Sequence, residues 1–193
     1  MRMIPFLCFL IYSAAFSTVD PVYPPNAVGG GMVVAQVEVA AGGIRKVDIL
    51  SGEEPFVSSC KSALARGSLP AERDGRELIV VLFRRPEISF AGSSGQKMSI
   101  SKAPESLPCP EYIVEPAYPP SGSGQGSVVL RADISSEGRV TGLDVVKPMG
   151  VFTDASMEAV RKWRFVPARD GQGRKTSSHA YAVLVFRFPL LAR

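Results

Sequence analysis

A six-residue motif occurs twice in the chain and constrains the fold more than any other feature. The motif, Acid-Pro-x-Tyr-Pro-Pro, begins at Asp20 and again at Glu115, and a glycine follows it at the same spacing, at Gly31 and Gly126. A motif that recurs together with its surroundings is typical of two copies of one structural unit. We therefore expect two related units in tandem rather than one large domain.

Both copies predict the same order of secondary structure. Apolar residues alternate with more polar ones over 33–39 and again over 128–134, which is typical of a half-buried strand. Each strand ends at a glycine-containing turn and a second strand follows, as in a β-hairpin. A helix, a loop and a third, apolar strand complete each copy. The predicted fold class is α+β, with two tandem β-β-α-β domains, each a small antiparallel sheet with one helix packed across it.

Composition divides the chain into four parts. Residues 1–17 have a cationic start, an apolar run and small residues at the end, which is typical of a secretory signal peptide; a retained membrane anchor is the alternative. Residues 87–110 are rich in serine, glycine and proline and predict a linker. The two domains are then expected at 18–86 and 111–193.

The helix of the second copy runs into a basic cluster around Trp163, the single tryptophan of the chain. Apolar residues at helical spacing predict one buried face, so we expect Trp163 to anchor the helix, with Phe165 and Pro167 as structural residues beside it. The neighbouring cations are explained by the negative end of the helix dipole. In the first copy Gly67 stands in the place of Trp163, and we expect looser packing there.

Charge and motif content argue against several classes of function. The net charge is +4, and residues 111–193 carry 11 basic and 8 acidic residues, a surplus too small for nucleic-acid binding. No named catalytic motif is present, so we expect neither an enzyme nor a cofactor. His179 has no ligand partner at metal spacing and is interpreted as a solvated loop histidine, which predicts no metal site.

Two cysteines follow the predicted signal peptide, Cys60 and Cys109. An oxidising compartment would allow them to form one disulfide. The alternative is one buried and one exposed thiol, and both interpretations are open from the sequence.

The second copy resembles the C-terminal domain of the TonB family. The resemblance is carried by "MEAVRKWRFVPARDGQG", with support from "EPAYPP" and "GSVVLRADISSEGRVTGLDVV". It covers nearly all of the second copy, whereas the first copy is degenerate. The family implies a β-β-α-β domain that works in the periplasm of Gram-negative bacteria and captures an extended peptide of an outer-membrane transporter by strand addition.

The resemblance also implies which residues bind the peptide. The last strand would be an unpaired edge that pairs with the peptide backbone, and two residues ahead of the first strand, Glu115 and Tyr118, would lie beside it. If the first copy already covered that edge, the tandem would be self-complementing and binding would require opening. The strand residues concerned are Ala182, Val183, Leu184, Val185, Phe186 and Arg187.

Two functions follow as hypotheses. The first is a periplasmic TonB-like interaction module that binds an extended segment of an outer-membrane protein or another envelope protein, in transport. The alternative is a structural or assembly component of the envelope that forms homo-oligomers or contacts the cell wall. Membrane contact is expected only through residues 1–17, in a form that keeps them and is anchored in the inner membrane.

Overall fold

The computed structural model describes residues 18–70, 74–84, 95–100 and 103–188. The predicted signal peptide, 1–17, lies outside these residues, as do 87–94 and 101–102 of the predicted linker, 87–110. No helix in the described part is long and apolar enough to span a bilayer. In chain order the elements are β1 (Gly31–Ala40), β2 (Gly43–Ser51), α1 (Phe56–Leu64), β3 (Gly75–Phe83), β4 (Gln96–Lys97), β5 (Cys109–Ile113), β6 (Gly126–Ile134), β7 (Val140–Lys147), α2 (Val151–Val160), β8 (Arg164–Val166) and β9 (Ser178–Phe186).

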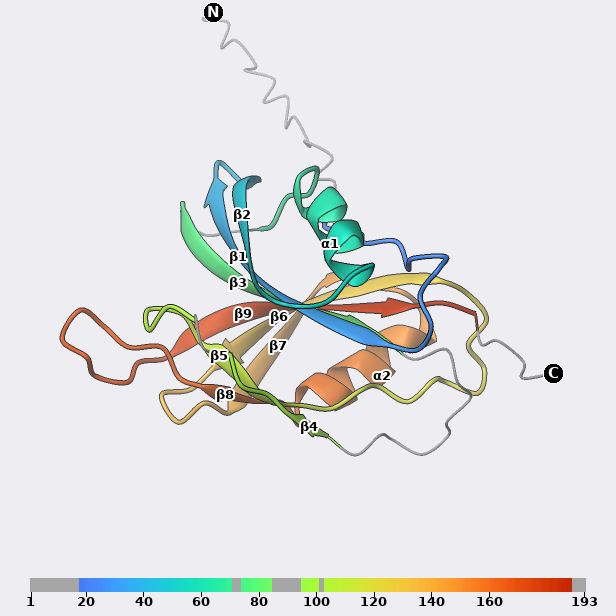
Figure 1. The fold of residues 1–193 in the computed structure, drawn as a ribbon. Coiled ribbons are helices and arrows are strands. Elements are labelled where there is room, and N and C mark those ends of the chain that lie inside the picture. The colour runs from blue at the N-terminus through green and yellow to red at the C-terminus, as the bar shows by residue number, and fades with distance from the viewer. Residues whose placement is uncertain (1–17, 71–73, 85–94, 101–102, 189–193) are drawn as a thin grey trace, which may run out of the picture.

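The element order β-β-α-β occurs in both parts of the chain, so the predicted α+β class is confirmed. We call residues 18–84, with β1, β2, α1 and β3, the first half, and residues 115–188, with β6, β7, α2, β8 and β9, the second half. The structure adds a feature that the sequence did not predict: the two three-stranded sheets are joined into one. The strand order is β2-β1-β3-β9-β6-β7, and only the central pair, β3 and β9, is parallel (Figure 1).

The two helices cover opposite faces of this sheet (Figure 1). Side chains alternate between the faces of a strand, so neighbouring residues of one strand belong to different cores. Val33 of β1 and Val81 of β3 pack with α1, whereas Val34 and Val80 pack on the side of α2. The central strands are therefore buried on both faces, which favours the continuous apolar runs seen in β3 and β9.

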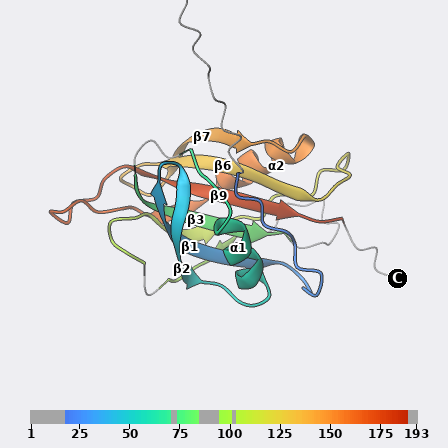
Figure 2. The ribbon, with the colours of Figure 1, turned by 90° about the horizontal axis from the view of Figure 1, so that it is seen from above.

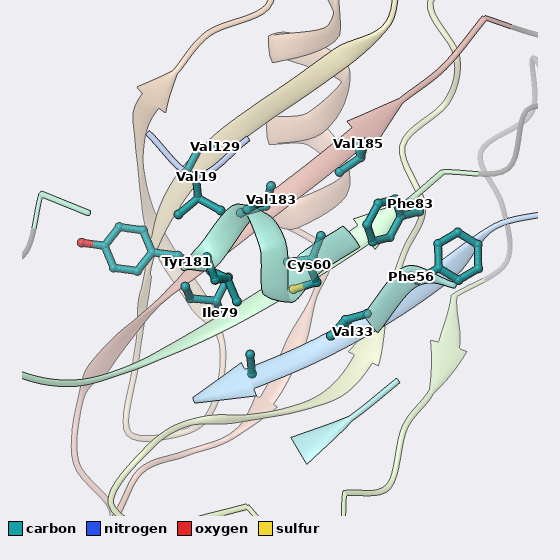
Figure 3. Close-up of a cluster of buried hydrophobic side chains, with 14 of the residues drawn as sticks. Val19, Val33, Phe56, Cys60, Ile79, Phe83, Val129, Tyr181, Val183 and Val185 are labelled. Atoms are coloured by element: carbon teal, nitrogen blue, oxygen red, sulfur yellow. The ribbon is translucent and has the colours of Figure 1, made fainter. Parts of the chain in front are cut away.

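The core under α1 contains side chains from both halves (Figure 3). Phe56 and Cys60 of α1 lie over Val33 and Phe83 of the first half. Residues of the second half complete the same cluster: Val129 of β6 and Tyr181, Val183 and Val185 of β9. Because each half contributes to the core of the other, the halves fold as one body around the shared sheet.

Trp163 lies in the core of the second half. Its side chain is fully buried, and its indole Nε1–H donates a hydrogen bond of 2.9 Å to the carbonyl of Val114. The α-helix ends at Val160, so Trp163 lies just beyond it rather than on its last turn. Phe165 of β8 is also buried and faces the same core. β8 pairs with β5, and β5 with β4, in a small second sheet that the sequence analysis did not predict.

Gly67, the counterpart of Trp163, is surrounded by other groups rather than by empty space. A Cβ atom at this position would lie 2.7 Å from Cγ2 of Val19 and 3.1 Å from the carbonyl oxygen of Ala63. Val19, from the segment ahead of the first motif, is completely buried. The expectation of looser packing at Gly67 is therefore wrong, because Val19 fills the space that a large side chain would take.

Candidate functional site

The last strand, predicted to be the peptide-binding edge, lies in the middle of the sheet. β9 pairs with β6 on one side and with β3 on the other, and the parallel register joins Ile79 to Tyr181 and Phe83 to Val185. Its residues 182–186 are at most 2 % exposed. The expectation of an unpaired edge at 182–187 is therefore wrong for this conformation. The run of apolar residues in β9 without polar interruption was the sequence signal of a strand buried on both faces.

The predicted site residue Tyr118 contacts the first half instead of a peptide. The guanidinium carbon of Arg84 lies 5.2 Å from the centroid of the Tyr118 ring, in a cation–π arrangement. The same ring packs edge-on against Phe152 of α2. Arg84 follows β3, so the end of the first half is held on the start of the second.

The reciprocal contact holds the end of the second half on the start of the first. The guanidinium carbon of Arg187 lies 4.9 Å from the centroid of the Tyr23 ring. Tyr23 and Tyr118 occupy the same place in the repeated motif, and Arg84 and Arg187 both follow the last strand of their copy. The two contacts are equivalent, as expected if an approximate two-fold axis relates the halves. In each of them, the arginine of one half lies over the tyrosine of the other.

Arg84, which the sequence did not single out, is a principal contact between the halves. It is only 4 % exposed. Its Nε donates to the carbonyl of Pro116 at 2.9 Å, and its backbone N–H donates to the carbonyl of Val185 at 2.9 Å. A buried cation is tolerated when its donors have partners, as here. The sequence "LFR" at 82–84 matches "VFR" at 185–187, so the arginine recurs in both copies. The residues next to Arg84 in the sequence do not show that its side chain contacts the other half.

Charged groups gather where the two halves meet near Tyr23. Burial raises the pKa of the Tyr23 phenol; the charge of Glu115 adds to this, and Arg187 and Arg84 act against it. The Tyr23 hydroxyl donates to the carbonyl of Gly29. Glu115 also forms part of the wall of a cavity of about 530 Å³, which lies between the ends of β1 and β2 and the residues around Met98.

Asp20, the counterpart of Glu115, binds the second half. Its carboxylate accepts a 2.7 Å hydrogen bond from the Ser127 hydroxyl, and the Lys147 ammonium lies 2.7 Å from its other oxygen. Both partners lie at one end of β6 and β7. The acidic residue of the first motif is therefore a contact between the halves.

His179 and Glu77 form a further contact across the central strand pair. Nε2 of His179 lies 2.8 Å from a carboxylate oxygen of Glu77. His179 belongs to β9 and Glu77 to β3, so the interpretation of His179 as a solvated loop residue is wrong. Within the described residues no group of three or more acidic, cysteine or histidine side chains is arranged to hold a metal ion.

The two cysteines are free thiols in separate places. Cys60 is buried in α1, and Cys109 is half-buried in β5 rather than exposed, so the structure contains two free thiols and not the disulfide. Burial raises the pKa of the Cys60 thiol to about 12 and also raises that of Cys109. A thiol with a raised pKa is a poor nucleophile at neutral pH, which fits a structural role.

The sheet has two outer edges, β2 in the first half and β7 in the second, at opposite sides of the molecule (Figure 2). Arg139, just ahead of β7, is bridged to Arg164. Among the described residues, no strand pairs with the outer side of β7 over its eight residues. An outer edge carries backbone donors and acceptors that can pair with an added strand.

Residues 115–188 match the family described as the Gram-negative bacterial TonB protein C-terminal. No curated protein and no solved structure matches the chain. The matched segment contains β6, β7, α2, β8 and β9, and it ends before residue 189. Domains of this family are interaction modules of the Gram-negative periplasm rather than enzymes. The match supports a TonB C-terminal domain in the second half and does not extend to the first.

Proposed function

We propose that this protein is a periplasmic TonB-like interaction module that binds an extended segment of an outer-membrane protein or another envelope protein by strand addition, in transport. The family match over 115–188 supports the proposal. The parallel pairing of β3 with β9 modifies it, because the first half occupies the edge that an added strand would use. We propose that the first half is a degenerate copy that acts as a permanent internal partner.

Because β9 is occupied, we assign the external peptide to the outer side of β7. Displacing β3 would expose apolar side chains that the halves share, such as Val81, Phe83, Val183 and Val185. At about 1.5–3 kcal/mol for each buried side chain, exposing these four costs about 6–12 kcal/mol. This is as large as the total stability of a typical domain, so a peptide of modest affinity would not open the sheet.

The residues of β7 suit an added strand. The strand has eight residues, contains no proline, and carries Val145 with 42 % of its surface exposed. Two β-bulges interrupt its pairing with β6. Bulges increase the twist of an edge strand and protect it from nonspecific aggregation. Between the two bulges, residues 142–145 pair regularly with β6, and this stretch is the one that an added strand would use.

A disulfide lock across the central strand pair tests which edge binds the peptide. Glu77 and His179 face each other from β3 and β9, so Glu77→Cys with His179→Cys places two thiols side by side. The chain without residues 1–17 is used, and its two native thiols are removed by Cys60→Ala and Cys109→Ser. The immobilised protein is presented with detergent-solubilised outer-membrane proteins of the source organism, oxidised or reduced, and the retained proteins are identified by mass spectrometry.

We expect the same transporters to be retained in both states, because the lock does not touch β7. Retention that is lost on oxidation and recovered on reduction would instead place the peptide at residues 182–187, with Glu115 and Tyr118 beside it. If no envelope protein is retained in either state, the proposed function is wrong.

A further inference from the structure

The outer side of β2 is a second open edge, and the proposed peptide site does not use it. β2 pairs with β1 on its inner side. At one end of its outer side, Gly43 is bridged to Ser68, and the Ile44 amide donates to the carbonyl of Gly67. From Arg45 to Ser51, no described residue pairs with the outer side of the strand.

Two opposite charges lie on one face of this open stretch. The Lys46 ammonium lies 2.9 Å from a carboxylate oxygen of Asp48 and 3.9 Å from one of Glu38 on β1. The side chains of Lys46 and Asp48 are 56 % and 43 % exposed. Residues two apart in a strand point to the same face, so both charges are presented together at the edge.

The other face of the same stretch is apolar. Val47 and Ile49 are half-buried and pack at the margin of the core under α1. A strand added outside β2 would cover the parts of these side chains that face solvent. Over 46–49 the edge therefore has two charges on one face and two aliphatic side chains on the other, and the exposed Arg45 lies at the register shift just before them.

We infer that β2 pairs with β2 of a second copy of this chain, antiparallel, about a two-fold axis through Val47. In antiparallel pairing centred on residue 47, the positions of opposite residues add to 94. Lys46 then lies opposite the partner's Asp48, and Asp48 opposite the partner's Lys46. Opposite charges in directly facing positions stabilise a strand pair, and like charges destabilise it.

The same axis fits the open length of the edge. Pairing of residues 46–48 with their equivalents uses only positions beyond the bridge at Gly43 and the register shift at Arg45, and Val47 faces its own equivalent at the centre. The pairing of β2 with β1 is regular over 46–49 and shifts in register at Arg45 and at Leu50, so the proposed contact uses the regular part of the strand. One two-fold axis thus brings the opposite charges face to face and avoids the occupied end.

The strand β7 lacks this self-complementarity. In an antiparallel pair about a two-fold axis, facing side chains lie on the same face of the sheet, so the numbers of facing residues add to an even total. Asp144 and Lys147, the two charged residues of β7, add to 291 and cannot face each other across such an axis. Lys147 is also held by Asp20. The two outer edges therefore differ: β2 fits a second copy, and β7 does not. The inference does not rest on the proposed function, which concerns β7.

Charge reversal with a complementation step tests the inference. The full chain without residues 1–17 is studied by sedimentation equilibrium over a concentration series, with four samples: the unaltered protein, Lys46→Glu, Asp48→Lys, and an equimolar mixture of the two variants. Each variant alone places like charges opposite each other twice. In a mixed dimer, each of the two facing pairs again joins one acidic and one basic side chain, because the two chains carry opposite changes.

We expect the unaltered protein to form dimers with rising concentration, each single variant to associate roughly tenfold more weakly, and the mixture to recover dimers. Glu158→Lys, on the exposed face of α2, is the matched control and should leave association unchanged. Circular dichroism melting shows whether each variant folds. A monomer at all concentrations up to millimolar, or two folded single variants that fail to complement each other, would overturn the inference.

Discussion

The guanidinium group of Arg84 lies over the ring of Tyr118, 5.2 Å from its centroid, and joins the last strand of the first half to the first segment of the second half. Arg187 and Tyr23 form the same contact in the opposite direction, at 4.9 Å. Between these two contacts, β3 and β9 pair in parallel. The halves are therefore bound to each other by their equivalent elements, as two subunits of a symmetric dimer would be.

Replacement of Arg84 by Met should lower the free energy of unfolding by about 2–3 kcal/mol. The variant keeps an unbranched side chain but removes a charged hydrogen bond to the Pro116 carbonyl and a buried cation–π contact. Arg187→Met is the matched control, because Arg187 is half-buried and should cost only about 1 kcal/mol. Denaturant titration measures both. Equal losses in the two variants would contradict the assignment of Arg84 as the principal contact.

Proline substitution at two adjacent positions of β7 should separate binding from stability. In a regular antiparallel edge strand, neighbouring N–H groups point alternately to the paired strand and to the open side. Residues 143–145 pair regularly with β6, so one of Asp144→Pro and Val145→Pro removes a ladder bond and the other an outward donor.

We expect one of these two variants to melt several degrees lower, and the other to keep its melting temperature and lose retention of envelope proteins. The retention assay is the one described for the disulfide lock. Unchanged retention by both folded variants would exclude β7 as the binding edge.

The stability of the protein above pH 9 should depend on Cys60. Burial raises the pKa of its thiol from 9.0 to about 12 in the folded state. A raised folded-state pKa means that the stabilising contribution is complete below pH 9 and is lost as the pH rises from 9 to 12, since the unfolded chain releases this proton first. Cys60→Ala should therefore lose less stability than the unaltered protein over this interval. Parallel curves of unfolding free energy against pH would contradict the assignment.

Gly67→Ala should destabilise the first half by about 1–3 kcal/mol. The added Cβ would lie 2.7 Å from Val19 and 3.1 Å from the carbonyl oxygen of Ala63, so the N-terminal segment would have to move. Gly75→Ala is the control, because a Cβ there meets no atom within 4 Å. Thermal melting compares the two variants, and a Gly67→Ala protein as stable as the control would show that Val19 is not packed tightly against this site.

The sequence by itself determined the local structure and much of the core. Period-two alternation predicted β1 and β6, turn glycines predicted the hairpins, and helical spacing placed Trp163 in the core. These features depend on side-chain patterns within a few residues, which a sequence records directly. The repeated motif also predicted two units of the same element order.

Only the tertiary structure decided that the two units share one sheet. Strands pair through backbone groups that every residue has, so the apolar run of β9 shows that the strand is buried but not which strand lies beside it. The partner is β3, 102 residues earlier for the pair Ile79 and Tyr181. Because β3 pairs with β9, Glu115, Tyr118 and Arg187 lie at the junction of the halves, beside residues of the first half. The sequence had led us to expect them beside a bound peptide.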